Sequence, residues 1–355
     1  VHYADPGYLM FVRESTLVAQ PFDPWRRELR GEAVPVGDKL SPGNLGLGAY
    51  STSKNGVLAF RPGAGRRGQL SWFDRGGKEV GIGSPDAQHL DFALSPDGTR
   101  LALDVAADQG RDVWVRDLQR GTTTRFTFDK AADGVPVWTP DGRSIIFASD
   151  RAGPMDLYIK NAAGTGEERL LYGDKDDKFP THVSPDGRYL VYMAQGTGTG
   201  LDIRVLPLTG EPKPTVIAAT PFNEISPTLS PDGRFIAYHS NESGRAEVYV
   251  HEFPEPKSKW QVSTAGGRQA SWSADGKELY YLAPDGGLMG VPVALGEGLQ
   301  AGTPEKLFQP RLLTLPTRWL YRPAKDGRFL VHTPLEREAT PPITVVVNWP
   351  EAVRR

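Results

Sequence analysis

The phrase Ser95-Pro96-Asp97-Gly98 recurs along this sequence, and its spacing decides the fold. Its proline presets the backbone for the first corner of a turn, its aspartate can bond the backbone two residues on, and its glycine takes a left-handed conformation. The glycines of the phrase and its copies stand 42 to 51 residues apart, which is the length of one blade of a β-propeller. They are Gly7, Gly56, Gly98, Gly142, Gly187, Gly233, Gly276 and Gly327.

A short β-rich run follows each turn, as in Leu101–Leu103 and Ile145–Phe147, and further short runs complete four strands per repeat. No segment has a convincing helical period. We therefore predict an all-β fold, a β-propeller of four-stranded blades that fills residues 1–355 as a single domain and is closed by pairing of the terminal blades. We count eight blades and keep seven as the alternative. The approximate blade bounds are 1–40, 41–86, 87–130, 131–174, 175–220, 221–264, 265–310 and 311–355.

Charge and composition exclude several classes of function. The 355-residue chain has a formal net charge of −2 and contains no cysteine. This charge favours neither nucleic acid nor an anionic membrane, and the lack of cysteine excludes disulfides and thiolate metal sites. No apolar run reaches the roughly 18 residues that a membrane-spanning helix needs. A strand-like pattern follows Val1 almost at once, so we expect the chain to be a piece of a longer protein.

A ring of candidate ligand-binding residues follows from the repeat. The position six residues before each turn phrase should mark the same place in every blade, at one mouth of a central channel. Five of the seven residues at this position are polar or titratable, while Leu47 and Gly267 are not. A ring with charges of both signs could bind a zwitterionic or peptide-like ligand, and the alternative is an ordinary solvated rim. The five candidates are His89, Asp133, Lys178, Glu224 and Arg318.

Catalysis and metal binding find little support in the sequence. No two histidines have a ligand spacing, although His89 and His182 lie on expected inner strands near Asp91 and Glu224. No Gly-x-Ser-x-Gly elbow or phosphate loop stands in the required setting. We therefore predict no catalytic residue, no metal and no cofactor. Acidic residues also recur just before the third strand of each repeat, where we expect them to accept backbone hydrogen bonds. They are Asp112, Asp156, Asp202 and Glu247.

The repeated Ser-Pro-Asp-Gly phrase resembles that of the TolB-like, WD-repeat-like propellers of bacteria, over nearly the whole chain. A narrower resemblance rests on stretches such as Gly7–Arg13, Lys259–Ser263 and Pro342–Trp349. These are similar to the C-terminal propeller of some bacterial receptor-like serine/threonine kinases, although no kinase signature occurs in this sequence. That resemblance implies a kinase domain and a membrane span before the propeller, and an extracytoplasmic location, periplasmic or at the cell surface.

From the repeat and the resemblance together, we predict a non-catalytic binding propeller, the sensor domain of such a kinase. Its ligand would be a protein, a peptide or a small molecule at one mouth of the channel, with no nucleic acid and no membrane insertion by this segment. Three alternatives stay open. They are the substrate-gating propeller of a prolyl-oligopeptidase-like serine peptidase, a TolB-like scaffold of an envelope complex, and a channel-site metal-dependent hydrolase or lyase.

Overall fold

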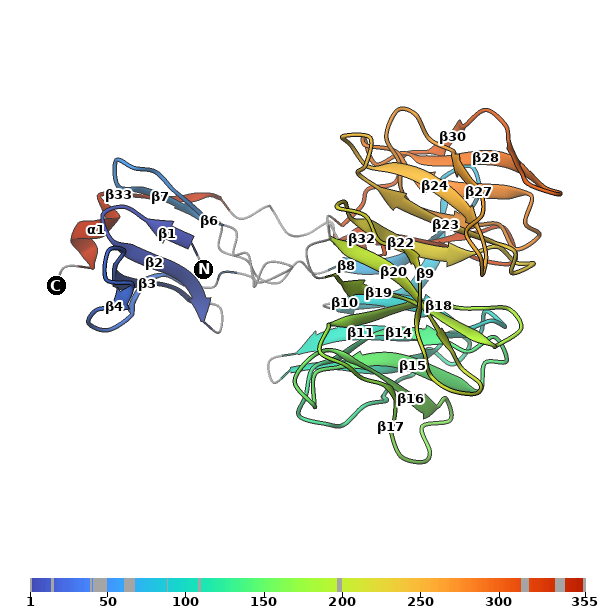
Figure 1. Ribbon diagram of the computed structural model, residues 1–355, viewed down its shortest axis with the longest axis horizontal. Coiled ribbons are helices and arrows are strands. Elements are labelled where there is room, and N and C mark those ends of the chain that lie inside the picture. Colours follow the sequence, from blue (N-terminus) through green and yellow to red (C-terminus); the bar gives the residue numbers. More distant parts are fainter. Residues whose placement is uncertain are drawn as a thin grey trace. The chain divides into compact units, whose positions relative to one another are not determined.

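The chain folds into two compact units in a computed structural model (Figure 1). The first, which we call the terminal unit, consists of Val1–Arg67 and Leu335–Arg355, and the second, the propeller unit, is Gly68–Pro334. The structure describes residues 2–13, 16–38, 40, 50–60, 68–87, 89–107, 110–196, 200–313, 319–335 and 342–353.

Five sheets of the propeller unit are each made from consecutive antiparallel strands. The first is β10 (His89–Leu94), β11 (Arg100–Ala107), β12 (Gly110–Asp117) and β13 (Thr123–Arg125). The second is β14 (Asp133–Trp138), β15 (Ser144–Ser149), β16 (Asp156–Asn161) and β17 (Arg169–Tyr172). The third is β18 (Lys178–Val183), β19 (Tyr189–Gln195), β20 (Leu201–Pro207) and β21 (Thr215–Ala218). The fourth is β22 (Glu224–Leu229), β23 (Phe235–Ser240), β24 (Glu247–Glu252) and β25 (Lys259–Gln261). The fifth is β26 (Arg268–Trp272), β27 (Glu278–Leu282), β28 (Leu288–Leu295), β29 (Leu299–Ala301) and β30 (Glu305–Phe308).

The sixth sheet combines the two ends of the propeller unit. Its strands follow the order β31 (Tyr321–Pro323), β32 (Phe329–Pro334), β8 (Gly68–Phe73) and β9 (Glu79–Ala87). The strands β32 and β8 pair over six residues, from Phe329 opposite Phe73 to Pro334 opposite Gly68. The hydroxyls of Ser71 and Thr333, which lie 262 residues apart in sequence, are within 3.2 Å of each other across this pair.

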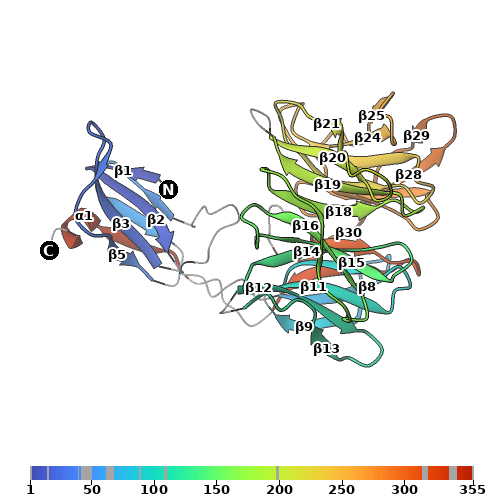
Figure 2. The same cartoon turned by 60° about the horizontal axis from the view of Figure 1, so that its bottom comes forward.

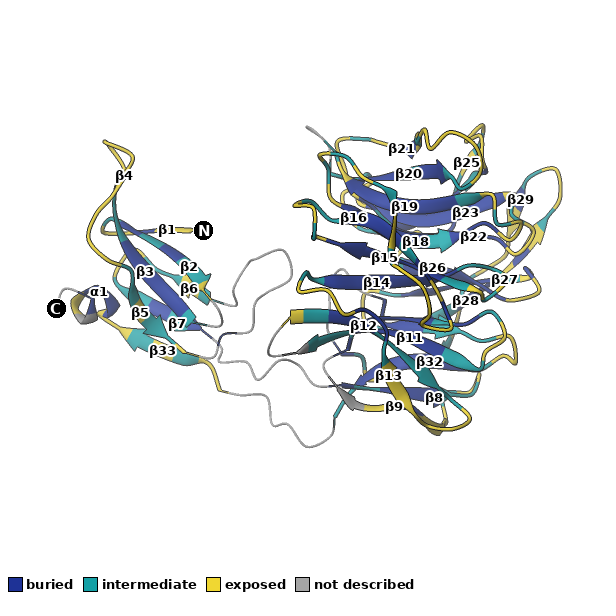
Figure 3. Ribbon diagram, turned by 90° about the horizontal axis from the view of Figure 1, so that it is seen from below, coloured by how far each residue is buried: buried dark blue, intermediate teal, exposed yellow. Residues whose placement is uncertain are grey.

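Six buried apolar clusters connect the six sheets in a cycle (Figures 2 and 3). Each cluster takes side chains from two neighbouring sheets, as where Val113 of the first sheet packs with Trp138 of the second. The next four clusters join the second sheet to the third, and so on to the sixth. The last cluster brings Leu330 of the sixth sheet against Phe92 of the first. Every sheet therefore buries both faces against neighbours, which is the packing of a β-propeller.

The terminal unit has two sheets of its own. One contains β1 (His2–Ala4), β2 (Tyr8–Arg13), β3 (Thr16–Asp23), β4 (Glu28–Leu29) and β5 (Val34–Gly37), and the other contains β33 (Thr344–Val347), β7 (Val57–Phe60) and β6 (Tyr50–Thr52). A short helix, α1 (Trp349–Ala352), follows β33. Met10, Leu58 and Trp349 are fully buried in the core of this unit.

Our prediction of eight blades, or seven, in one ring is not confirmed. The predicted bounds from 87–130 to 265–310 each enclose one observed sheet, so five blades match. The three remaining predicted blades, 1–40, 41–86 and 311–355, are divided differently. The strands β8, β9, β31 and β32 together make one blade, and the other segments make the terminal unit. The phrases at Gly7 and Gly56 do open β-hairpins, but these hairpins belong to the terminal unit.

The repeated turn holds together as its chemistry predicts. In the first copy the Gly98 N–H donates to the Ser95 carbonyl at 2.8 Å, and Gly98 has a φ of 72°. The Ser95 hydroxyl donates to Asp97 and accepts from the Arg100 N–H at 2.9 Å. The Asp97 carboxylate also accepts from the Thr99 N–H. These hydrogen bonds stabilise the charged aspartate.

Acid should therefore weaken the propeller through its turns. Hydrogen bonds from the serine or threonine of the phrase hold the pKa values of Asp97, Asp141, Asp186 and Asp275 below their ordinary value, that of Asp186 at about 2. Because the folded-state pKa lies below the unfolded one, this stability is present above about pH 4 and is lost as the pH falls toward 2. Urea unfolding at several pH values should show this decline.

The Ser184→Ala variant tests the origin of the decline. It removes the hydroxyl that bonds Asp186 and the Tyr189 N–H, so we expect about 1 kcal/mol lower stability at pH 7 and a smaller loss on acidification. The exposed Ser243→Ala change should alter neither quantity. An equal acid response in Ser184→Ala and the unmodified chain would contradict this origin.

Candidate functional site

The first strands of the six sheets surround the axis of the propeller. Successive inner strands are in contact, from β10 to β14, β18, β22, β26 and β31. The circuit returns to its start where the Arg322 guanidinium on β31 donates through Nε to the Phe92 carbonyl on β10 at 3.4 Å. Side chains at the start of these strands are therefore the ones that a ligand approaching the axis would meet.

A bulge interrupts the inner strands near their starts. Register irregularities occur on β10, β14, β18, β22 and β26. At three of them a residue other than glycine has a positive φ, namely Val135 at 52° and Ser226 and Gln269 at 55°. Such conformations cost free energy and persist only where surrounding contacts hold them.

The contacts that hold the bulges come from the preceding sheet. The Val135 N–H donates to Asp104 at 2.9 Å, and the Gln269 N–H donates to Nδ1 of His239 at 3.3 Å. The Ser226 N–H meets the sulfur of Met193 at 3.3 Å. At the corresponding place on β18 the residue is Pro180, which has no N–H to satisfy. At three bulges, the second strand of one sheet thus holds the inner strand of the next, which fixes that part of the wall around the axis.

Four of the five predicted site residues are the first residues of inner strands, but none of these four lies on a solvated rim. His89, Asp133, Lys178 and Glu224 begin β10, β14, β18 and β22, and each is at most 2% exposed. Arg318 lies outside the described residues. Buried charged groups require partners, so each of these side chains has a structural role to be accounted for. Their part in ligand binding stays a prediction.

Lys178 joins two sheets of the propeller. Its ammonium donates to Asp156 of the preceding sheet at 2.8 Å, pairs with Asp174 at 2.8 Å and contacts the Asp176 carbonyl. All three hydrogen-bond donors of the ammonium are therefore occupied within the protein. Asp156 is one of the acidic residues that we placed before the third strand, where it closes this ion pair.

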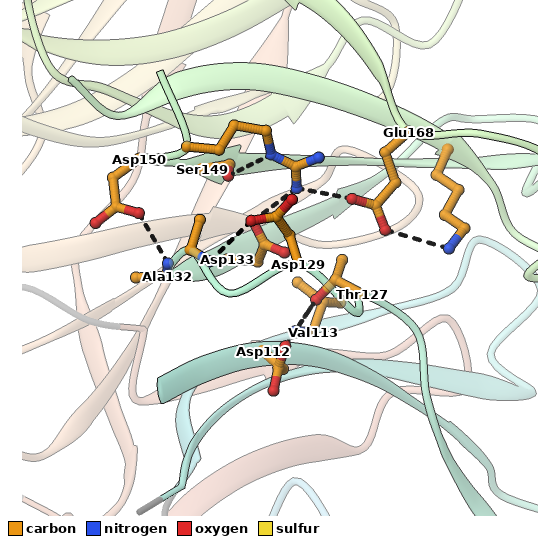
Figure 4. A network of polar contacts seen from close by, with 12 residues as sticks. Asp112, Val113, Thr127, Asp129, Ala132, Asp133, Ser149, Asp150 and Glu168 are labelled. Carbon is orange, nitrogen blue, oxygen red and sulfur yellow. Dashed lines mark hydrogen bonds and ion pairs between the residues drawn. The ribbon is translucent and has the colours of Figure 1, made fainter. Parts of the chain in front are cut away.

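Asp133 and Glu224 also have partners within the protein, and Figure 4 shows the surroundings of Asp133. One carboxylate oxygen of Asp133, Oδ2, is buried without a hydrogen-bond partner among the described residues. Asp133 accepts from Arg151 at 3.0 Å, and Arg151 also contacts Ser149 and Glu168. Burial raises the pKa of the Asp133 carboxyl in spite of the arginine. Glu224 accepts from the Thr220 hydroxyl, and burial raises its pKa as well.

The histidines near the axis do not form a metal centre with these carboxylates. His89 lies 3.1 Å from the Ser84 hydroxyl through Nε2, and His182 accepts the Leu229 N–H at 2.8 Å through Nδ1. Among the residues that the structure describes, no group of three or more His, Asp or Glu is arranged to hold a metal ion.

The acidic residues before the third strand are buried, but among the described residues only Glu247 accepts the backbone hydrogen bond that we expected; Asp112, Asp156 and Asp202 are paired with side-chain cations instead. Asp112 accepts from Arg125 at 2.9 Å, and Glu247 accepts from the Gly266 N–H at 2.9 Å and from the Ser263 hydroxyl. All four of these residues are at most 8% exposed.

Two arginines that the sequence analysis missed lie beside the axis. Arg322 is half-buried, and its charge acts on His182 of β18, three sheets away around the cycle. Burial, and then this arginine, lowers the pKa of His182 to about 4. Burial lowers the pKa of Arg322 itself to about 10, opposed by Asp91. Only a group near the axis can act on strands on opposite sides of the ring.

The second arginine belongs to a set that we call the entrance ring. Its members stand eight residues before the turn glycine of each sheet of the propeller unit, one residue after the predicted ring. Four of the six are apolar, one is glycine and one is Arg268. They are Leu90, Gly134, Phe179, Ile225, Arg268 and Trp319. The same repeat spacing in the sequence, counted one residue further toward each turn, would have identified the entrance ring.

Comparison with known proteins places this propeller among those of the TolB type. Residues 82–211 match the family model of the TolB β-propeller domain. An uncharacterized protein of Agrobacterium fabrum is 31% identical over 153 residues, which are 41% of this chain and 52% of that protein. The uncharacterized peptidase YuxL of Bacillus subtilis is 34% identical over 122 residues, which are 32% of this chain and 18% of the peptidase. The chain thus spans about half of the first relative and about a fifth of the second.

Solved structures agree on the fold. A protein from Agrobacterium tumefaciens assigned as TolB has a TM-score of 0.60 at 19% identity, covering 76% of this chain and 99% of that one. TolB from Acinetobacter baumannii has a TM-score of 0.52 at 16% identity, covering 95% and 80%. The chain contains a β-propeller of the TolB type. Within its described part, no helix has the length and apolar character that crossing a bilayer requires.

The Lys178 ion pair gives a test of the inner-strand anchors. In Lys178→Met the carboxylate of Asp156 stays buried without its cation, so we expect the free energy of unfolding to fall by about 3 kcal/mol. The double variant Lys178→Met/Asp156→Leu should recover much of that loss, because no buried charge is left from this pair. The exposed Lys175→Met change is the control and should stay within about 0.5 kcal/mol. Equal denaturant midpoints for Lys178→Met and the control would contradict the anchor role.

Proposed function

We propose that this propeller is a non-catalytic binding module that takes its ligand at the entrance ring. The observation that carries this proposal is the wall around the axis. Three of its bulges are held by contacts from the preceding sheet, and half-exposed apolar side chains stand at the starts of the inner strands. Phe179 and Ile225 are such side chains. A surface that is already ordered loses little conformational entropy when a ligand binds, and this favours affinity. The similarity to a TolB domain over residues 82–211 also supports a binding role.

We further propose that the module is the extracytoplasmic sensor domain of a bacterial serine/threonine kinase. The support is the resemblance of the strand and loop stretches given above, including Pro342–Trp349, the region of β33 and α1. Ligand binding at the propeller would then be relayed to the kinase by the rest of the protein.

A peptidase-associated propeller is the second candidate, and one observation favours it. The uncharacterized peptidase YuxL matches 122 residues of this chain at 34% identity. In that arrangement the propeller would select substrates for a hydrolase domain elsewhere in the same protein. The coding sequence around residues 1–355 separates the candidates, since it should encode a kinase and a membrane span in one case and an α/β-hydrolase in the other.

Selection from a random dodecapeptide library on the immobilised chain tests the binding role. We expect convergent peptides with micromolar Kd and no cleavage of the bound peptide by mass spectrometry. Phe179→Ala should weaken these peptides at least tenfold, because a half-buried aromatic at the entrance supplies contact area. The control Val216→Ala changes an exposed residue on the outer strand β21 of the same sheet and should have no effect.

Two results would contradict the binding role. One is a library selection that yields peptides whose affinity is the same for Phe179→Ala and for Val216→Ala. The other is recovery of cleaved peptide with the purified chain alone, which would make it a catalyst.

A further inference from the structure

Arg268 has a positive charge with no partner among the described residues. It is half-buried at the start of β26, and no hydrogen bond or ion pair joins its guanidinium to any described residue. Arg111 and Arg151 of the propeller are half-buried as well, but they are paired with Asp104 and Asp133. Burial alone lowers the pKa of Arg268, so its charge is partly desolvated, and no described carboxylate offsets that cost in free energy.

Arg322 on the neighbouring inner strand has unused donors as well. Among the described residues, its one hydrogen bond is the long one from Nε to the Phe92 carbonyl, although a guanidinium has five N–H groups. Arg322 stands three residues further along its strand than the entrance ring. Its plane is held by Trp319, whose ring centre lies 3.8 Å from the guanidinium carbon. The negative charge of Asp91 raises the pKa of Arg322, whereas burial is the one influence on the pKa of Arg268.

The backbone next to each of the two arginines is held by hydrogen bonds. Gln269, which follows Arg268, accepts the Leu320 N–H at 2.9 Å through its side chain and the Tyr321 hydroxyl at 2.8 Å through its carbonyl. Its own N–H is bonded to His239. The residues next to the two arginines, Gln269 after Arg268 and Tyr321 before Arg322, are therefore held by hydrogen bonds across two sheet boundaries.

The entrance ring shows what surrounds the unpaired charge. At the positions equivalent to Arg268, the sheets of β10, β18 and β22 carry Leu90, Phe179 and Ile225, all half-exposed. A ligand that enters here meets one free cation among apolar side chains. An acid with an apolar body fits this combination, because its carboxylate can accept two hydrogen bonds from the Arg268 guanidinium while its body covers the apolar members.

We propose that Arg268 forms a carboxylate-binding subsite at the entrance ring, and that the ligand is an apolar carboxylate. This inference rests on the proposed binding function and specifies its chemistry. The carboxylate has two possible sources, a free organic acid or an acidic residue within a peptide.

Calorimetric titration with matched probes tests the subsite. The peptides acetyl-Ala-Leu-Glu-Leu-Ala-amide and acetyl-Ala-Leu-Gln-Leu-Ala-amide differ only in the charge of one residue, and hexanoate represents a free acid. We expect the glutamate peptide to bind at least tenfold more tightly than the glutamine peptide, and Arg268→Gln to abolish the difference. Arg143→Gln, at an exposed turn arginine, should preserve it. Hexanoate binding that Arg268→Gln abolishes would support the free-acid source.

The inference is overturned if neither the glutamate peptide nor hexanoate binds in a manner that depends on Arg268. Thermal unfolding of Arg268→Gln excludes loss of the fold as a cause, and Arg268→Lys should retain part of the discrimination. Library peptides that bind with dependence on Phe179 but not on Arg268 would leave the binding function in place and remove only this subsite.

Discussion

The pairing of β32 with β8 is the constraint on which the rest of the propeller depends. It joins the two ends of the propeller unit in one sheet, with the hydroxyls of Ser71 and Thr333 in contact across it. Without it, the first sheet would lose the neighbour that covers Phe92, and the fifth would lose the neighbour that covers Tyr280. Contacts so distant in sequence are costly in chain entropy, and the buried area of two sheet boundaries offsets that cost.

The closed cycle also explains why the axis can serve as a binding site. Five inner strands are bulged, and three of these bulges are held by a side chain of the preceding sheet, as Gln269 is by His239. This linkage can remain in register around the ring only if every sheet has a neighbour on both sides. The buried ion pair of Lys178 and Asp156 adds a polar link of the same kind. Three bulges of the wall are therefore fixed before a ligand binds, and in our proposal the ligand's carboxylate meets the unpaired Arg268 guanidinium.

Local chemistry made much of the fold predictable. The turn beginning at Ser95 and its copies determine where a sheet starts, so the bounds of five blades follow from sequence. The partner of a terminal hairpin depends on long-range packing, which the turn phrase does not encode, and the hairpins at Gly7 and Gly56 belong to the terminal unit. The predicted ring and the entrance ring lie on the same inner strands, one residue apart, and ligand binding at either stays a prediction. His89 and Asp133 are buried anchors, whereas Leu90 and Arg268 belong to the next position along.

A disulfide across the sixth sheet tests the central claim most directly, because the chain has no cysteine of its own. Gln69 and Thr333 face each other in the pairing of β8 with β32, so Gln69→Cys/Thr333→Cys should form an intramolecular disulfide on mild oxidation and raise the denaturation midpoint. The pair Gln69→Cys/Phe329→Cys, displaced by four residues along β32, should not. Equal cross-linking of the two pairs, or none in either, would contradict a ring closed by β32 and β8.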